Sequence, residues 1–163
     1  MQAPGPQPPL NISGFLAAAF SAPGLAAIVC MLGAIAATVV APGAWNGLGS
    51  ALFGLIVLTV IATVWGALPS LLFGGLVLAV IQRIWWRERP SAVVFMSGGV
   101  VAAGLYVLAG LGIAELSQGA AMFFAPWATT AFMSAGRSWW VFASLLLAGA
   151  GAGLIYAVCV KRG

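Results

Sequence analysis

Long apolar stretches alternate with short polar segments along this chain. The longest stretch begins at Gly47, reaches Gln82 without a charged side chain, and is followed at once by Arg83-Ile84-Trp85-Trp86-Arg87-Glu88-Arg89. A run of this kind, closed by paired tryptophans and arginines, is typical of a helix that leaves the hydrocarbon core of a membrane. The pattern therefore predicts a polytopic membrane protein rather than a water-soluble domain.

Four apolar blocks predict four transmembrane helices within one domain that covers 15–163. Pro23 interrupts the first block near its start, so we expect the first span to begin next to this proline. Residues 1–14 hold four prolines and predict a short extended tail. The expected spans are approximately 22–41, 50–82, 91–114 and 138–160.

The second block admits two arrangements. A helix over 48–82 would be about 52 Å long, whereas the hydrocarbon core of a bilayer is about 30 Å thick. Either one tilted helix is kinked near Pro69, or a tight turn at Gly66-Ala67-Leu68-Pro69 makes two short spans, 50–66 and 70–86. We expect the kinked helix, because neighbouring helices satisfy a carbonyl that a proline leaves free inside a bundle. Two short spans would give five in total and place the N-terminus outside.

The segment 115–137, between the third and fourth spans, is too apolar for a free loop. Its apolar members include Met122, Phe123, Phe124, Trp127, Phe132 and Met133. Such a composition predicts an amphipathic or interfacial helix on the outer face. The fold class we expect is thus all-α: a polytopic transmembrane helical bundle of four spans, with five possible, and an interfacial helix between the last two spans.

The basic residues predict how the chain is oriented. Most of them lie on one side of a four-span arrangement, namely Arg83, Arg87, Arg89, Lys161 and Arg162, whereas the opposite side carries Arg137 alone. The positive-inside rule then places the N and C termini in the cytoplasm. We expect a bacterial inner (plasma) membrane, in which these five side chains set the orientation or contact anionic lipid headgroups.

The composition argues against most enzyme classes. Of 163 residues, 63% are hydrophobic and 5% are charged, whereas soluble domains carry about a quarter charged residues. The chain has no histidine and no aspartate, and Cys30 and Cys159 lie in separate spans without C-x-x-C spacing. We therefore expect no catalytic residue, metal site or cofactor. The net charge of +4 arises at span ends rather than in one patch, so a nucleic-acid partner is not expected.

Glu115 is the strongest candidate for a functional side chain. It ends the third span after a long uncharged stretch, where an acidic residue can bind a proton or cation or pair with a partner subunit. The alternative is an interfacial ion pair with Arg137, which precedes the fourth span on the same side.

Small residues predict close helix packing in the third and fourth spans. Gly149 and Gly153 form a G-x-x-x-G pair, and Gly98 and Gly99 begin similar faces on the third span. In lipid, such faces allow the close backbone approach that holds helices together. The pattern fits a contact within one bundle as well as a contact with another copy or another protein.

The second span combines Leu68-Pro69-Ser70-Leu71 with a terminal Arg83, and in this the chain is similar to small bacterial inner-membrane proteins of unassigned role. That resemblance implies a location and no activity. We predict a non-catalytic subunit or scaffold of a membrane assembly, whose partners are the lipid bilayer and other membrane subunits or further copies of itself. The alternative is a small oligomeric transporter or channel that uses Glu115.

Overall fold

The computed structural model describes residues 10–39, 48–84, 90–117, 119–120, 124–125 and 138–162. Within these residues the structure is helical and contains no strand. The long helices are α1 (Ile12–Val39), α2 (Leu48–Ile84), α3 (Ala92–Leu116) and α6 (Ser138–Arg162).

Each of these helices contains a stretch that is long and apolar enough to cross a membrane. The stretches are Ile12–Gly33, Phe53–Ile84, Ala92–Leu116 and Trp140–Lys161. The expected all-α fold with four spanning helices is therefore confirmed for the described part of the chain.

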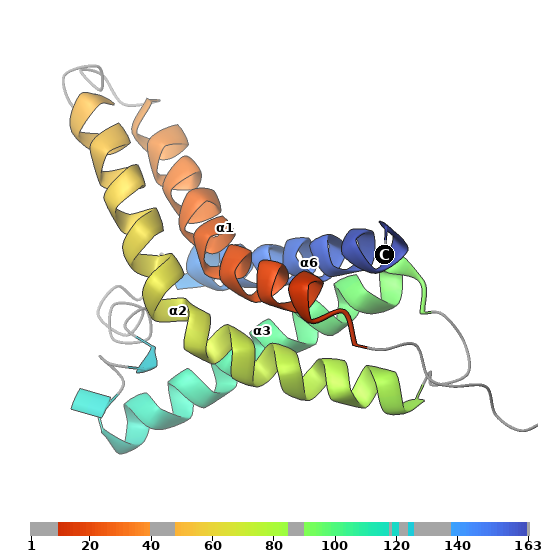
Figure 1. Ribbon diagram of the computed structural model, residues 1–163. Coiled ribbons are helices and arrows are strands. Elements are labelled where there is room, and N and C mark those ends of the chain that lie inside the picture. Colours follow the sequence, from red (N-terminus) through yellow and green to blue (C-terminus); the bar gives the residue numbers. More distant parts are fainter. Residues whose placement is uncertain are drawn as a thin grey trace, which may run out of the picture.

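The helices contact one another as a ring, α1 with α2, α2 with α3, α3 with α6, and α6 with α1. Figure 1 shows that the first half of α2 runs beside the second half of α1, and that these two halves form an arm projecting away from α3. The second half of α2 turns away from the arm and packs against α3. The four long helices therefore surround the point at which the arm joins the rest of the bundle.

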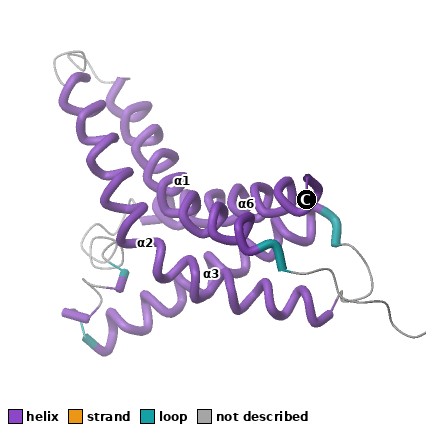
Figure 2. Tube along the Cα trace, viewed as in Figure 1, coloured by secondary structure: helices purple, strands orange, loops and turns teal. Residues whose placement is uncertain are grey.

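Helix α2 is continuous over 37 residues, with Pro69 inside it, and it bends near its middle (Figure 2). Proline lacks a backbone N–H, and its ring clashes with the preceding turn, which are the usual causes of a sharp helix bend. Of the two arrangements expected from the sequence, the structure therefore has the single bent helix, and the short spans 50–66 and 70–86 are not formed.

Helix α1 begins earlier than the sequence predicts, because it passes through Pro23 and starts at Ile12 instead of near Ala22. Asn11 explains this start: its Oδ1 accepts hydrogen bonds from the Gly14 N–H (2.9 Å) and the Ser13 hydroxyl (2.8 Å). An asparagine in this position satisfies N–H groups that the first helical turn otherwise leaves without partners. The apolar residues before Pro23 thus belong to the first spanning helix.

Two other expectations fall largely on residues that are not described. Of the expected tail 1–14, residues 1–9 lie outside the described ranges, and 12–14 belong to α1. The expected interfacial helix over 115–137 is described only in part: α3 continues to Leu116, and residues 119–120 and 124 are helical.

The tightest contact in the bundle joins α3 and α6. A Cβ atom added to Gly99 would overlap the carbonyl oxygen of Gly149, and one added to Gly153 would overlap the carbonyl oxygen of Phe95. Gly98 lies beside α2 instead, where an added Cβ would meet Cδ1 of Ile81 at 2.5 Å. The small residues of α3 and α6 therefore bring two backbones of the same chain together, as G-x-x-x-G faces do in lipid.

Candidate functional site: a central apolar cavity

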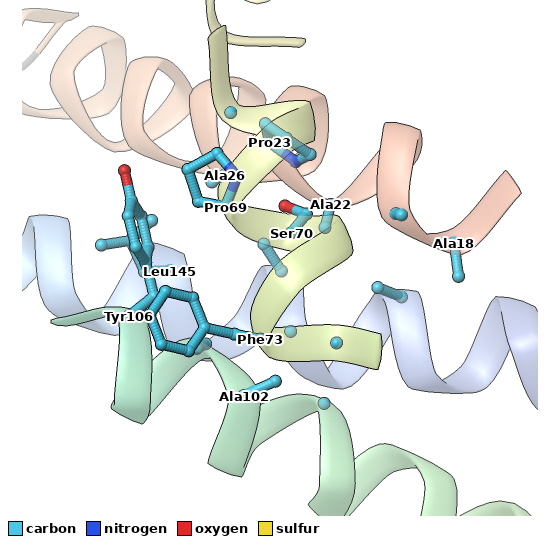
Figure 3. A pocket seen from close by; sticks show the side chains of 18 of the residues that line it. Ala18, Ala22, Pro23, Ala26, Pro69, Ser70, Phe73, Ala102, Tyr106 and Leu145 are labelled. Carbon is cyan, nitrogen blue, oxygen red and sulfur yellow. The ribbon is translucent and has the colours of Figure 1, made fainter. Parts of the chain in front are cut away.

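A cavity of about 340 Å³ lies where the four long helices meet. Most of its walls are small side chains, and the bend of α2 contributes Pro69, Ser70 and Phe73 (Figure 3). Alanines of α1 line the neighbouring wall, and α3 and α6 add Ala102, Tyr106 and Leu145. The space exists because alanine and glycine occupy these facing helical positions.

Helix α1 also changes direction along its length (Figure 1), and its Pro23 lies beside the bend of α2 and next to the cavity. A Cβ added to Gly66 would lie only 2.5 Å from Cβ of Pro23, so Gly66 is needed for α2 to approach the proline of α1. Pro69 follows Gly66 by about one helical turn. Both prolines also line the cavity, so the two bends and the cavity are parts of one local arrangement.

The hydroxyl groups that face the cavity are mostly hydrogen-bonded within the protein. The side chain of Ser144 is 1% exposed, and its hydroxyl donates to the carbonyl of Trp140 at 2.8 Å. Tyr106 donates to the carbonyl of Phe124 at 3.0 Å. None of the described residues that line the cavity is charged. The cavity therefore offers a hydrocarbon-like surface with few polar groups available to an occupant.

Aromatic rings close one side of the cavity. Tyr106 lies 6.0 Å from Phe73 and 5.7 Å from Phe124, measured between ring centroids. These separations are typical of favourable aromatic pairs, which add roughly 0.5–1.5 kcal/mol each to the burial of their surface. The cluster therefore packs the second half of α2 against α3.

A second hollow adjoins the cavity on the outer side of α2. It measures about 220 Å³ and shares Trp65 and Pro69 with the cavity. Its other walls include Val64 and Leu68, whose side chains are 70% and 65% exposed. The cavity thus borders a surface whose large apolar side chains face outward from the bundle.

A polar cluster joins three helices at the end of the bundle that holds the α1 N-terminus. The Asn11 amide donates from Nδ2 to the carbonyl of Cys159 at 3.1 Å, and Tyr156 contacts the side chain of Gln82 and the backbone of Asn11. The start of α1 and the ends of α2 and α6 therefore lie together, as an even number of spans requires.

The structure separates the charged residues named by the sequence. Glu115 is exposed in the last turn of α3 and is not among the residues that line the cavity. Arg83 and Lys161 are exposed near the ends of α2 and α6. The remaining basic candidates, whose side chains lie outside the description, are Arg87, Arg89, Arg137 and Arg162. The pairing of Glu115 with Arg137 and the headgroup contacts therefore stay predictions.

The cavity itself did not emerge from the sequence. A usable signal was present, because Pro23 and Pro69 each lie near a glycine and Pro23 is flanked by alanine-rich helical turns. Which of these turns face one another is set by packing between helices, and local sequence does not encode it.

Among the described residues, no three histidine, cysteine, aspartate or glutamate side chains form a group that could hold a metal ion. Compared with protein-family models, curated proteins and solved structures, the chain gives no match. What the chain does must therefore be inferred from its own residues and their geometry.

Proposed function

We propose that this integral membrane protein is a non-catalytic subunit or scaffold of a membrane assembly. The observation that carries the proposal is that polar side chains in the bundle are hydrogen-bonded to the protein's own backbone. Asn11 bonds to the backbone of α6, Tyr106 bonds to the backbone of Phe124, and Ser144 bonds to the preceding turn of its own helix, so these side chains are already engaged in the fold of the chain. The chain also lacks histidine and aspartate, the side chains that most often serve as bases or ligands.

The contacts between helices within the chain show which helix faces remain available to a partner. Gly99 of α3 and Gly149 and Gly153 of α6 already pack against backbone of the same chain, so these three glycines do not offer a free small-residue face to another subunit. The outer side of α2 is different, since it carries a continuous row of large exposed side chains: Phe53, Ile56, Val60, Val64, Leu68, Leu72 and Leu76. Lipid and partner subunits would meet the protein along this row.

For location, we propose a bacterial inner membrane with both termini in the cytoplasm. The polar cluster at Asn11 supports this, because it puts the α1 start at the same end of the bundle as Arg83 and Lys161. Basic residues favour the cytoplasmic side of a membrane helix.

Purification in a mild detergent, followed by mass spectrometry of the intact complex, tests the scaffold role. We expect the chain to elute with at least one further membrane subunit or with copies of itself, and a four-span protein of unrelated sequence, purified identically, serves as the control. A lone monomer with nothing specifically attached would contradict the proposal.

The alternative role, a small oligomeric transporter or channel that uses Glu115, receives less support. Glu115 is exposed at the end of α3 and outside the cavity lining, so the cavity does not support a pathway that uses it. Its test is flux in proteoliposomes, because a transporter that depends on this carboxylate loses flux in Glu115→Gln.

A further inference from the structure

We propose that the central cavity is a binding site for one hydrocarbon chain of a membrane lipid, which enters from the bilayer past Trp65 and Pro69. The scaffold role does not require such an occupant, so the two proposals stand or fall separately.

The volume of the cavity fits a chain of this kind. An apolar protein cavity of about 150 Å³ accommodates benzene, which has six carbon atoms. At the same volume per carbon atom, a cavity of 340 Å³ holds roughly fourteen carbon atoms, which is most of a lipid acyl chain.

A transmembrane helix of a partner protein fits less well. A single helical turn, taken as a cylinder about 10 Å wide and 5.4 Å tall, occupies roughly 420 Å³. This exceeds the whole cavity of about 340 Å³. A narrow, flexible chain can enter where a helix cannot, and the same limit applies to a helix from a second copy.

Because the walls of the cavity are mainly apolar and uncharged, they favour a hydrocarbon chain as the occupant. The hydroxyls of Ser144 and Tyr106 donate to backbone carbonyls, Ser70 adds a further hydroxyl, and the described lining carries no charge to hold a headgroup or an ion. An occupant with several polar groups of its own would leave most of them without hydrogen-bond partners, which is costly in a low-dielectric interior.

The cavity is also continuous with the surface that the bilayer covers. Trp65 and Pro69 belong both to the cavity and to the outer hollow, whose Val64 and Leu68 point away from the bundle. A lipid chain in the bilayer therefore reaches the opening without crossing water. Once inside, it contacts walls from four helices, and these dispersion contacts, rather than a hydrophobic effect, favour binding within lipid.

The test uses the full-length protein in nanodiscs that contain a phospholipid with a photoreactive diazirine near the middle of one acyl chain. After irradiation, mass spectrometry locates the labelled residues. We expect labelling of cavity-lining residues such as Ser70 and Ala102 in addition to outward-facing residues such as Leu108. Labelling confined to the outward-facing residues would overturn the proposal, because it would describe ordinary surrounding lipid.

Two neighbouring glycines of α2 provide matched variants. Gly74 lines the cavity and Gly75 does not, yet a Cβ added at either position meets only ordinary contacts with Phe15, at 3.6 and 3.5 Å. The four side-chain carbons of leucine would replace roughly four of the fourteen carbons that the cavity holds. We expect Gly74→Leu to lose most of the cavity labelling, whereas Gly75→Leu keeps it.

Ala102→Leu, which narrows the cavity from α3, provides an independent variant if Gly74→Leu does not fold, as judged by gel filtration and circular dichroism. Cavity labelling that survives in the folded filling variants would overturn the proposal. So would a co-purifying protein that crosslinks to the cavity residues in place of the lipid. Labelling of the wild-type protein alone still decides the question if both variants misfold.

Discussion

Replacing Gly99 by alanine should weaken the bundle more than the same change at other glycines of α3. The added methyl group would overlap the Gly149 carbonyl oxygen and lie 2.7 Å from its carbonyl carbon. Ordinary carbon–carbon contact is about 3.5 Å, so α3 and α6 would have to separate by at least about 0.8 Å over this contact, and further to relieve the overlap with the oxygen. Because the neighbouring atoms are backbone, no side-chain rotation relieves the overlap.

The expected loss for Gly99→Ala is about 1–3 kcal/mol, which is typical of overpacked contacts and corresponds to a roughly 5- to 150-fold fall in the folded-to-unfolded ratio. Two glycines of the same helix are controls. At Gly98 the obstacle is the flexible end of Ile81, so Gly98→Ala should cost less; at Gly104 nothing lies within 4 Å, so Gly104→Ala should be neutral or stabilising.

Reversible unfolding of the variants by SDS in mixed micelles, followed by far-ultraviolet circular dichroism, gives the free energies to compare. The expected order of destabilisation is Gly99→Ala, then Gly98→Ala, then Gly104→Ala. Equal unfolding free energies for Gly99→Ala and Gly104→Ala would refute the α3–α6 contact on which this reasoning rests.

Three further predictions concern other parts of the bundle. Asn11→Ala should speed hydrogen exchange at the Gly14 amide, because the cap of α1 is worth about 1 kcal/mol; unchanged exchange would argue against the cap. Gly66→Val should displace the Pro23 side of α1 and shift the distance between spin labels on the arm and on α3; an unaltered distance distribution would contradict the contact between the bends. Glu115→Gln should leave stability and lipid labelling of the cavity unchanged, because its carboxylate is exposed outside the cavity; a large effect on either would link this residue to the centre of the bundle.

The sequence predicted the number of spanning helices well because lipid imposes a strong constraint. A backbone in hydrocarbon must satisfy its own hydrogen bonds, so long apolar runs become helices and charged residues mark their ends. The bend of α2 was also predictable, since Pro69 removes one N–H donor in the middle of a run too long for one straight span.

The start of α1 was placed too late because Pro23 is a strong helix breaker in water. The structure shows that Asn11 caps the helix well before this proline. In the bundle, Gly66 admits the proline ring against α2, so the helix continues through it. The proline is tolerated because of a partner on another helix, which local sequence does not specify.

The candidate site was harder to predict than the fold. Glu115 stood out in the sequence because it is charged, whereas the central cavity is lined mostly by small residues such as alanine, glycine and proline, which carry no chemical signature. A cavity is a property of which helix faces meet, and alanine-rich turns look alike in sequence whether they pack tightly or leave space between them.

Membrane fractionation tests most directly the claim that a bilayer surrounds these four helices. Cells that express the chain are lysed without detergent, the membranes are washed with alkaline carbonate, and the fractions are separated by ultracentrifugation. The protein should remain in the washed membrane pellet and be released only by detergent. Recovery of folded protein in the detergent-free supernatant would contradict the account.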